Sequence, residues 1–148
     1  CTGGTLVISE KRLEQDVAKM NDIIYTNKIS HTLMLPSLYK VLLEYSDLSK
    51  LKSLTTIMVA GEACSVALCQ YHFNKLPNTG LYNEYGPTEA SVWCMAYKIT
   101  QENLGNITPI GSAVANAEIY LLDPNLNLVP FPIRLEVNYT KLGIWGGI

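Results

Sequence analysis

The residues that could do chemistry are concentrated in one heptapeptide, NEYGPTE, at positions 83–89. It places an amide, a phenol ring, a hydroxyl and two carboxylates within one short stretch. Gly86 permits close approach of the backbone, and Pro87 fixes φ, so the chain turns there. A Gly-Pro pair alone is typical of an ordinary β-turn. With polar groups on both sides of the turn, the composition is typical of a nucleotide site.

NEYGPTE resembles the most diagnostic internal motif of the adenylation domains of nonribosomal peptide synthetases, within the acyl-adenylating (AMP-binding) superfamily. Further segments resemble that family in its order and approximate spacing. They are TLMLPSLY at 32–39, VAGEA at 59–63, TPIGSA at 108–113, EIYLLD at 118–123 and LVP at 128–130. The resemblance covers residues 1 to about 130. It implies part of the large subdomain of an acyl-adenylating enzyme.

The resemblance implies roles for single residues. Asn83 would hydrogen-bond the adenine amino group, and Tyr85 would stack on the purine; an amide and a phenol ring suit these tasks. Thr88 would contact the α-phosphate and Glu89 would bind Mg²⁺, which prefers oxygen ligands. Thr88 and Glu89 form the expected catalytic pair, with Glu89 as metal ligand. The expected cofactor-binding set is Gly61, Glu62, Ala63, Asn83, Tyr85, Gly86 and Thr88.

The same resemblance implies an amino-acid pocket, which is apolar apart from one carboxylate. Its expected lining is Leu33, Met58, Ala60, Glu84, Val92 and Trp93. As core residues they would need no further explanation. If Glu84 faces the cavity, an unpaired buried carboxylate would be costly, so a substrate with a cationic or hydrogen-bond-donating side chain is the hypothesis.

The implied reaction joins ATP and an amino acid to give aminoacyl-AMP and pyrophosphate, and then transfers the aminoacyl group to a phosphopantetheine thiol on a separate carrier domain. Expected partners are the amino acid and the carrier-protein and condensation domains of a parent synthetase. We expect this chain to be an internal fragment, inactive alone, because the family's phosphate loop, Thr-Gly-Asp element and C-terminal lysine do not occur in it. Two alternatives are another acyl-adenylating enzyme, such as an acyl-CoA ligase, and a truncated remnant without catalysis.

Residues 131–148 depart from the family, which would show Gly-Glu-Leu there. The codons TTA GAG GTG AAT TAC can encode Leu135 to Tyr139, and shifted by two nucleotides they encode Arg-Gly-Glu-Leu. We therefore predict a divergent tail that follows a reading-frame change. The coding DNA tests this.

The amino-acid composition excludes several classes of protein. The chain has 148 residues, 48% apolar and 16% charged, with a net charge of −2, which suits one globular domain. No basic cluster indicates nucleic acid, and no apolar stretch is long enough to span a membrane or act as a signal peptide. A cytoplasmic location is the default. The four cysteines lack CxxC spacing, so we expect buried free thiols, and we expect structural roles for His31 and His72.

These groups must be positioned by alternating strands and helices. Strands are expected near 5–8, 30–35, 55–60 and 80–83, and helices near 11–27, 38–45 and 65–75, where Leu13, Val17, Met20 and Ile24 form one apolar stripe. Such alternation predicts an α/β fold with a mostly parallel sheet and helices packed on its faces. Strands near 92–99 and 117–122, separated by a polar loop at 100–108, predict a mixed or antiparallel C-terminal part.

Overall fold

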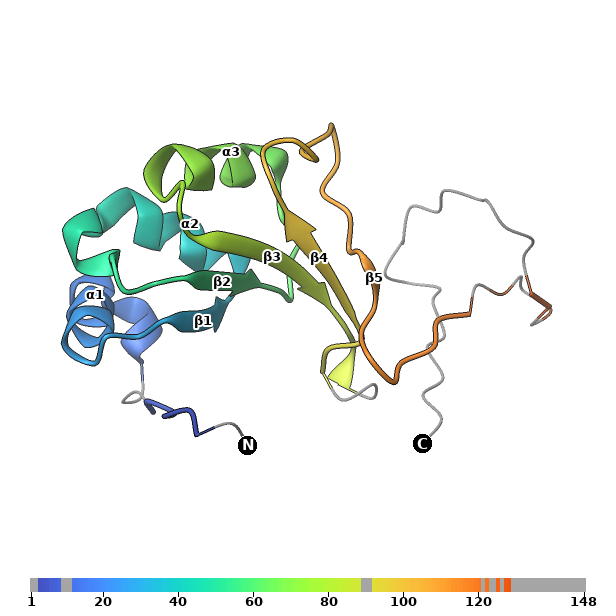
Figure 1. The fold of residues 1–148 in the computed structure, drawn as a ribbon, viewed down its shortest axis with the longest axis horizontal. Helices are drawn as coiled ribbons and strands as arrows, with labels where there is room; N and C mark the ends of the chain where they lie inside the picture. Colours follow the sequence, from blue (N-terminus) through green and yellow to red (C-terminus); the bar gives the residue numbers. More distant parts are fainter. Residues whose placement is uncertain are drawn as a thin grey trace.

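The structure, a computed structural model, describes residues 3–8, 12–88, 92–120, 122, 125 and 127–128. These residues form one five-stranded sheet with three α-helices and two short 3-10 helices (Figure 1). The helices are α1 (Val17–Thr26), α2 (Pro36–Tyr45) and α3 (Val66–Lys75), with η1 (Leu13–Gln15) and η2 (Leu48–Leu51). The strands are β1 (His31–Met34), β2 (Thr56–Val59), β3 (Gly80–Tyr85), β4 (Met95–Ile99) and β5 (Ser112–Ala113).

The sheet confirms the predicted α/β class. Its strands follow chain order, with β1–β2 and β2–β3 parallel and β3–β4 and β4–β5 antiparallel. Helical crossovers join the parallel strands, and the direct connection from β3 to β4 reverses the chain. The N-terminal part is therefore parallel and the C-terminal part antiparallel, as the sequence indicates.

The helices cover one face of the sheet. In Figure 1, α2 and α3 lie on the same side of the strands. The core joins the inward side chains of β2 and β3 (Ile57, Val59 and Leu81) to residues of all three helices. The predicted flanking helices are present, and those of the described residues pack on one face of the sheet. Since both parallel crossovers connect neighbouring strands in the same direction and share one hand, they place α2 and α3 on the same side.

The opposite face of the sheet is more open. Leu33 on β1 pairs in register with Met58 on β2, and Met58 with Tyr82 on β3. Because side chains alternate along a strand, these three residues face away from the side that carries Ile57 and Val59. Leu33 keeps 43% of its surface exposed. This face thus leaves apolar side chains accessible.

The helix boundaries follow local capping chemistry. Helix α1 begins after Asp16, whose carboxylate accepts a hydrogen bond from the Lys19 amide at 2.9 Å. Residues 9–11, where the sequence placed the start of this helix, lie outside the described residues. Pro36 is the first residue of α2, where its missing N–H is not needed, and Ser65 caps α3 by accepting from the Leu68 amide. The sequence predicted a helix from about residue 11, but α1 begins at Val17. The prediction was early because the apolar stripe starts at Leu13, which lies in the short 3-10 helix η1 that precedes α1.

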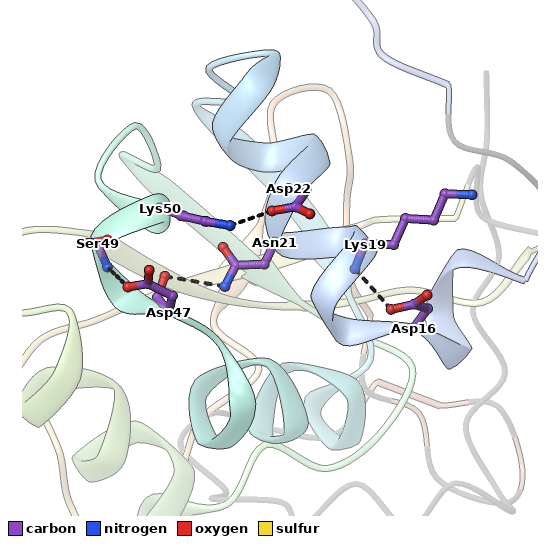
Figure 2. A network of polar contacts seen from close by, with 7 residues as sticks. All are labelled: Asp16, Lys19, Asn21, Asp22, Asp47, Ser49 and Lys50. Atoms are coloured by element: carbon purple, nitrogen blue, oxygen red, sulfur yellow. Dashed lines mark hydrogen bonds and ion pairs between the residues drawn. The ribbon is translucent and has the colours of Figure 1, made fainter.

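A polar network ties α1 to η2 (Figure 2). The Asn21 side-chain amide donates to the Asp47 carbonyl at 3.2 Å, and Lys50 Nζ lies 2.5 Å from Asp22 Oδ1. The Asp47 carboxylate accepts from the Ser49 amide and so caps η2. These contacts fix the edge of the domain that is remote from NEYGPTE.

Two predicted strands are absent from the described residues. Residues 5–8 are not in a strand, and Leu6 and Ile8 are each 84% exposed, so this segment has no ladder that would hold it extended. Residues 117–120 are also not in a strand; Leu122 makes an isolated antiparallel bridge with Leu128, and the partner of β4 is β5 instead. Alternating apolar residues favour a strand only where a neighbouring strand is available. The predicted divergent tail, 131–148, lies outside the described residues.

Candidate functional site

The carboxyl ends of β2 and β3 open onto one pocket of about 650 Å³. It lies at the end of the parallel strands, the place where open α/β sheets bind ligands. Its wall combines the loop after β2, the end of β3 and the segment that precedes β5. The lining residues are Gly61, Glu62, Ala63, Cys64, Ser65, Val66, Asn83, Glu84, Tyr85, Gly86, Pro87, Asn106, Ile107, Thr108 and Ile110.

Six of the seven residues expected to bind the cofactor meet at this pocket. They are Gly61, Glu62, Ala63, Asn83, Tyr85 and Gly86. The seventh, Thr88, is exposed and lies outside this lining, and Glu89 lies outside the described residues. The structure thus brings the residues proposed for the base to one pocket and does not place Thr88, proposed for the α-phosphate, among them.

Asn83 is the polar group that the fold orients most firmly. It is 4% exposed on β3, and its Nδ2 donates to the carbonyl of Pro109 at 2.8 Å. That bond orients the amide and uses one of its two N–H donors. The amide oxygen is then the atom available to accept from an amino group, which is the role that the resemblance implies.

Glu62 lines the pocket, but its carboxylate is engaged elsewhere. Oε2 accepts from the Ser37 amide and Oε1 from the Ser37 hydroxyl, each at 3.0 Å. Ser37 lies in the first turn of α2, where backbone N–H groups lack partners within the helix and a negative charge is favoured. The side chain therefore ties the loop after β2 to α2, and residues 61–63 offer mainly backbone to the pocket.

Two glycines permit the backbone path around the pocket. A Cβ on Gly86 would lie 2.4 Å from the Val92 carbonyl oxygen and 2.8 Å from the Cys94 nitrogen, so only glycine lets the chain pass so close to its return segment. Gly61 has φ +83°, and a Cβ there would meet Leu35 Cδ2 at 2.9 Å. Glycine is required at Gly86 by the close backbone contact and at Gly61 by the positive φ.

Tyr85 is the last residue of β3 and is half-buried in the wall of the pocket. Its carbonyl accepts from the Cys94 amide at 3.0 Å, which anchors the strand end to the returning chain. A ring that is neither enclosed in the core nor free in solvent can present one face to a planar ligand. This position is compatible with stacking.

The residues expected to line an amino-acid pocket divide into two groups. Leu33, Met58 and Glu84 share the open face of the sheet by strand register. Ala60 is buried at the end of β2, whereas Val92 is exposed with φ +75° and Trp93 is half-buried before β4. Burial raises the pKa of the Glu84 carboxyl. The described residues therefore place part of this set on one surface.

The sequence analysis missed the segment that closes the pocket. Residues 106–110 contribute Asn106, Ile107, Thr108 and Ile110 to its lining. The TPIGSA motif that begins at Thr108 was recognised as a family feature but not as part of a site. Asn83 connects it to β3 through the Pro109 carbonyl. Only the tertiary contact between segments more than 20 residues apart along the chain reveals the role.

No group of three or more His, Cys, Asp or Glu side chains that could hold a metal ion occurs within the described part of the chain. None of the helices described there is long and apolar enough to cross a membrane. Cys64, Cys69 and Cys94 are buried free thiols, as predicted, and Cys1 lies outside the described residues.

Comparison with known proteins identifies the class. Residues 1–134 match the family model described as AMP-binding enzyme. The chain belongs to this family. The match spans the loop after β2, residues 83–87 and residues 106–110, which contribute to the lining of the pocket.

The similar curated proteins include synthetases of peptides. The chain is 32% identical to malpinin synthetase of Mortierella alpina, over 98% of this chain and 2% of that protein. It is 32% identical to bacitracin synthase 3 of Bacillus licheniformis, over 97% and 2%, and 34% identical to gramicidin S synthase 1 of Brevibacillus brevis, over 86% and 11%. The chain therefore spans a small part of the length of these relatives. They do not favour the acyl-CoA ligase alternative.

Solved structures show the same fold. A nonribosomal peptide synthetase protein containing adenylation and PCP domains has a TM-score of 0.70 and 26% identity, over 78% of this chain and 23% of that chain. The same protein bound to a vinylsulfonamide inhibitor has a TM-score of 0.69. The mixed sheet and its helices are thus the fold of part of an adenylation domain.

Proposed function

We propose that this chain is part of an amino-acid-activating adenylation domain in a nonribosomal peptide synthetase. The longer protein would join ATP and an amino acid to give aminoacyl-AMP and pyrophosphate, and then acylate a phosphopantetheine thiol on a carrier domain, next to condensation domains in the cytoplasm. The single observation that supports this most is the pocket that gathers Asn83, Tyr85, Gly86 and residues 61–63. The peptide synthetases among the relatives support the same class.

Adenine is the part of ATP for which the described residues offer the best fit. The pocket combines a half-buried aromatic ring, an oriented amide and exposed loop backbone, which suit a planar heterocycle with an exocyclic amino group. In the proposal, Tyr85 stacks on the base and Asn83 Oδ1 accepts from its amino group. Thr88 would contact the α-phosphate and Glu89 would hold Mg²⁺, which neutralises charge on the phosphates.

The proposed substrate amino acid carries a cationic or hydrogen-bond-donating side chain. Glu84 lies among apolar neighbours in the proposed set, and its raised pKa reflects the cost of burying its charge. A donor on the substrate would lower that cost. Substrate-activation assays on the longer protein test this, and a preference for a purely aliphatic amino acid would reject it.

The base-binding part of the proposal can be tested on the chain itself. Titration with AMP, followed by NMR, should give weak binding with Kd of about 1 mM, equivalent to about −4 kcal/mol, because half a site lacks most of the preorganised contacts. Asn83→Ala should weaken binding about tenfold, the loss of about one buried hydrogen bond. Asn74→Ala removes a matched amide from the exposed side of α3 and should leave binding unchanged. Equal effects of the two substitutions would contradict the proposal.

Catalysis is tested separately by pyrophosphate exchange. The 148-residue chain alone should show none, because Thr88 and Glu89 would act together with groups that this chain does not contain. A chimera in which residues 1–130 replace the matching segment of a related adenylation domain should show exchange. Exchange by the isolated chain would overturn the assignment of the missing groups to other segments. A folded, inactive chimera would favour the non-catalytic remnant.

A further inference from the structure

Two cysteines lie against each other beside the pocket. Cys64 directly precedes Ser65, the residue that caps α3, and Cys69 lies in the second turn of that helix. Their sulfur atoms are 3.6 Å apart, close enough for a thiol–thiol hydrogen bond. At these two helix positions an apolar pair often packs together and fixes the entry of the chain into the helix. Here that contact is made by two free thiols.

The two sulfurs differ in access. Cys64 is 7% exposed and lines the pocket, whereas Cys69 is fully buried behind it. A small reagent that enters the pocket therefore reaches Cys64 first. Cys69 is reached only through its neighbour.

The surroundings let the pair carry one negative charge. The Cys64 thiol can donate to Cys69, and this hydrogen bond lowers the pKa of Cys69; the hydroxyl of Thr108, 3.8 Å away, acts in the same direction. Because it holds the remaining proton, Cys64 has a raised pKa. These shifts favour the negative charge on Cys69. Cys64 presents a thiolate, the reactive form, to the pocket when its proton moves along the hydrogen bond to Cys69.

We propose that Cys64 and Cys69 form a reversible dithiol–disulfide pair in the pocket wall, with a small peroxide as oxidant. The Cys64 thiolate attacks one oxygen of hydrogen peroxide; an S–O bond forms, the O–O bond breaks, and hydroxide leaves and takes up a proton. Cys69 sulfur then attacks the sulfenic sulfur of Cys64. The S–S bond forms, the S–O bond breaks, and a second water is released. The two thiols lose two electrons and two protons, and the peroxide is reduced to water.

The geometry requires little movement. The sulfurs must approach from 3.6 Å to about 2.05 Å, which side-chain rotation over about 1.5 Å can supply. Cys94 provides an internal control, because it is also buried but its sulfur donates to the Tyr85 carbonyl, at 3.6 Å, instead of to a second thiol. The inference therefore concerns a specific pair and not thiols in general.

The experiment uses the full chain with Cys1→Ser, so that Cys94 is the one remaining other thiol. After brief treatment with hydrogen peroxide, the protein is denatured, alkylated and digested with trypsin. No Lys or Arg lies between Cys64 and Cys69, so both fall in peptide 53–75, while Cys94 falls in peptide 76–98. We expect peptide 53–75 to lose two hydrogens, at least about tenfold faster than Cys94 is oxidised, and dithiothreitol to reverse the change.

Single substitutions separate the two roles. Cys69→Ser should stop the reaction at a sulfenic acid on Cys64, which dimedone traps, and Cys64→Ser should leave Cys69 unreactive at the same dose. Circular dichroism verifies that each variant folds, and the mapping of the unsubstituted pair needs neither. The proposal is overturned if both thiols stay open to alkylation, if Cys94 oxidises as fast, or if Cys64→Ser leaves the oxidation of Cys69 unchanged.

Discussion

Two polar clusters lie on the helix-covered side of the sheet. They differ in how many of their hydrogen-bonding groups remain available to a ligand. The enclosed cluster consists of Tyr39, His72 and Thr79. Tyr39 and His72 are fully buried; the Tyr39 hydroxyl lies 2.5 Å from His72 Nδ1, and His72 Nε2 lies 2.9 Å from the Thr79 carbonyl. The pocket cluster consists of Asn83 and Glu62, with their partners Pro109 and Ser37.

The partners of His72 decide its chemistry. A carbonyl can only accept, so Nε2 must carry the proton, and Nδ1 then accepts from the Tyr39 hydroxyl. The neutral ring has both nitrogens occupied, and burial lowers the pKa of His72 and raises that of Tyr39. The cluster joins α2 to α3 and offers nothing to a ligand. This confirms the structural role predicted for His72.

The pocket cluster uses one side of each polar group for the fold and keeps the other side toward the cavity. Asn83 is anchored by one N–H of its amide and Glu62 by its carboxylate, and both residues line the pocket. Burial and polarity alone do not separate the two clusters. The two clusters differ in the number of hydrogen-bonding positions that the fold leaves unused.

The largest effect should come from His72→Ala. It removes a buried ring and strands the Tyr39 hydroxyl and the Thr79 carbonyl, so we expect a loss of about 3–5 kcal/mol in the free energy of unfolding. Urea denaturation measures this. His31→Ala is the matched control, because His31 is exposed on β1, and it should change stability little. Comparable losses in the free energy of unfolding of the two variants would contradict the special structural role of the enclosed cluster.

Tyr39→Phe should separate stability from binding. It removes the hydroxyl that donates to His72 Nδ1 and keeps the ring in the core, so we expect a loss of about 1–3 kcal/mol. AMP binding should stay within about twofold of the parent chain, since the enclosed cluster does not reach the pocket. A tenfold loss of AMP affinity, as expected for Asn83→Ala, would show that the two clusters are coupled.

Glu62→Ala should have a smaller effect on stability. It removes the carboxylate that accepts from Ser37 at the start of α2, and loss of such a cap costs about 1 kcal/mol. The measurement is thermal unfolding. Glu118→Ala, which removes an exposed carboxylate outside the pocket, serves as the control. A midpoint that does not change would mean that the cap contributes nothing.

The smallest effect should be on pH dependence. Because the folded-state pKa of His72 is lowered, the unfolded chain binds its proton at higher pH than the folded chain. The stability from the neutral ring is complete above about pH 6.5 and is lost as pH falls through the lower folded pKa. Urea unfolding from pH 7.5 to about pH 4 should show this decline in His31→Ala. His72→Gln should lack it; an equal decline there would assign the effect to another group.

Sequence patterns predicted the elements well where local chemistry decides them. The helix predicted at 65–75 matches α3, which Ser65 caps, and the apolar spacing of α1 places Met20 and Ile24 in the core. The helix predicted at 38–45 begins slightly earlier, at Pro36. The same kind of pattern was wrong for residues 5–8 and 117–120, because a strand needs a partner that local sequence does not specify.

The NEYGPTE motif and its resemblance to the family also predicted which residues lie in one site. Residues 61–63, Asn83, Tyr85 and Gly86 were expected to share a site, and they meet at one pocket. The contribution of residues 106–110 and the contact between Cys64 and Cys69 were missed. The contact of residues 106–110 with β3 depends on where two segments 26 residues apart lie in space. Cys64 and Cys69 are five residues apart, and their contact follows from the way α3 begins.

The amino-acid sequence by itself determined the order of strands and helices, the capping of the helices and the family, since these follow from neighbouring residues and short motifs. The tertiary structure decided that the helices share one face, that Pro109 orients Asn83, and that Glu62 binds the start of α2. These features join residues distant in sequence, and only packing of the whole domain brings them within reach of a hydrogen bond.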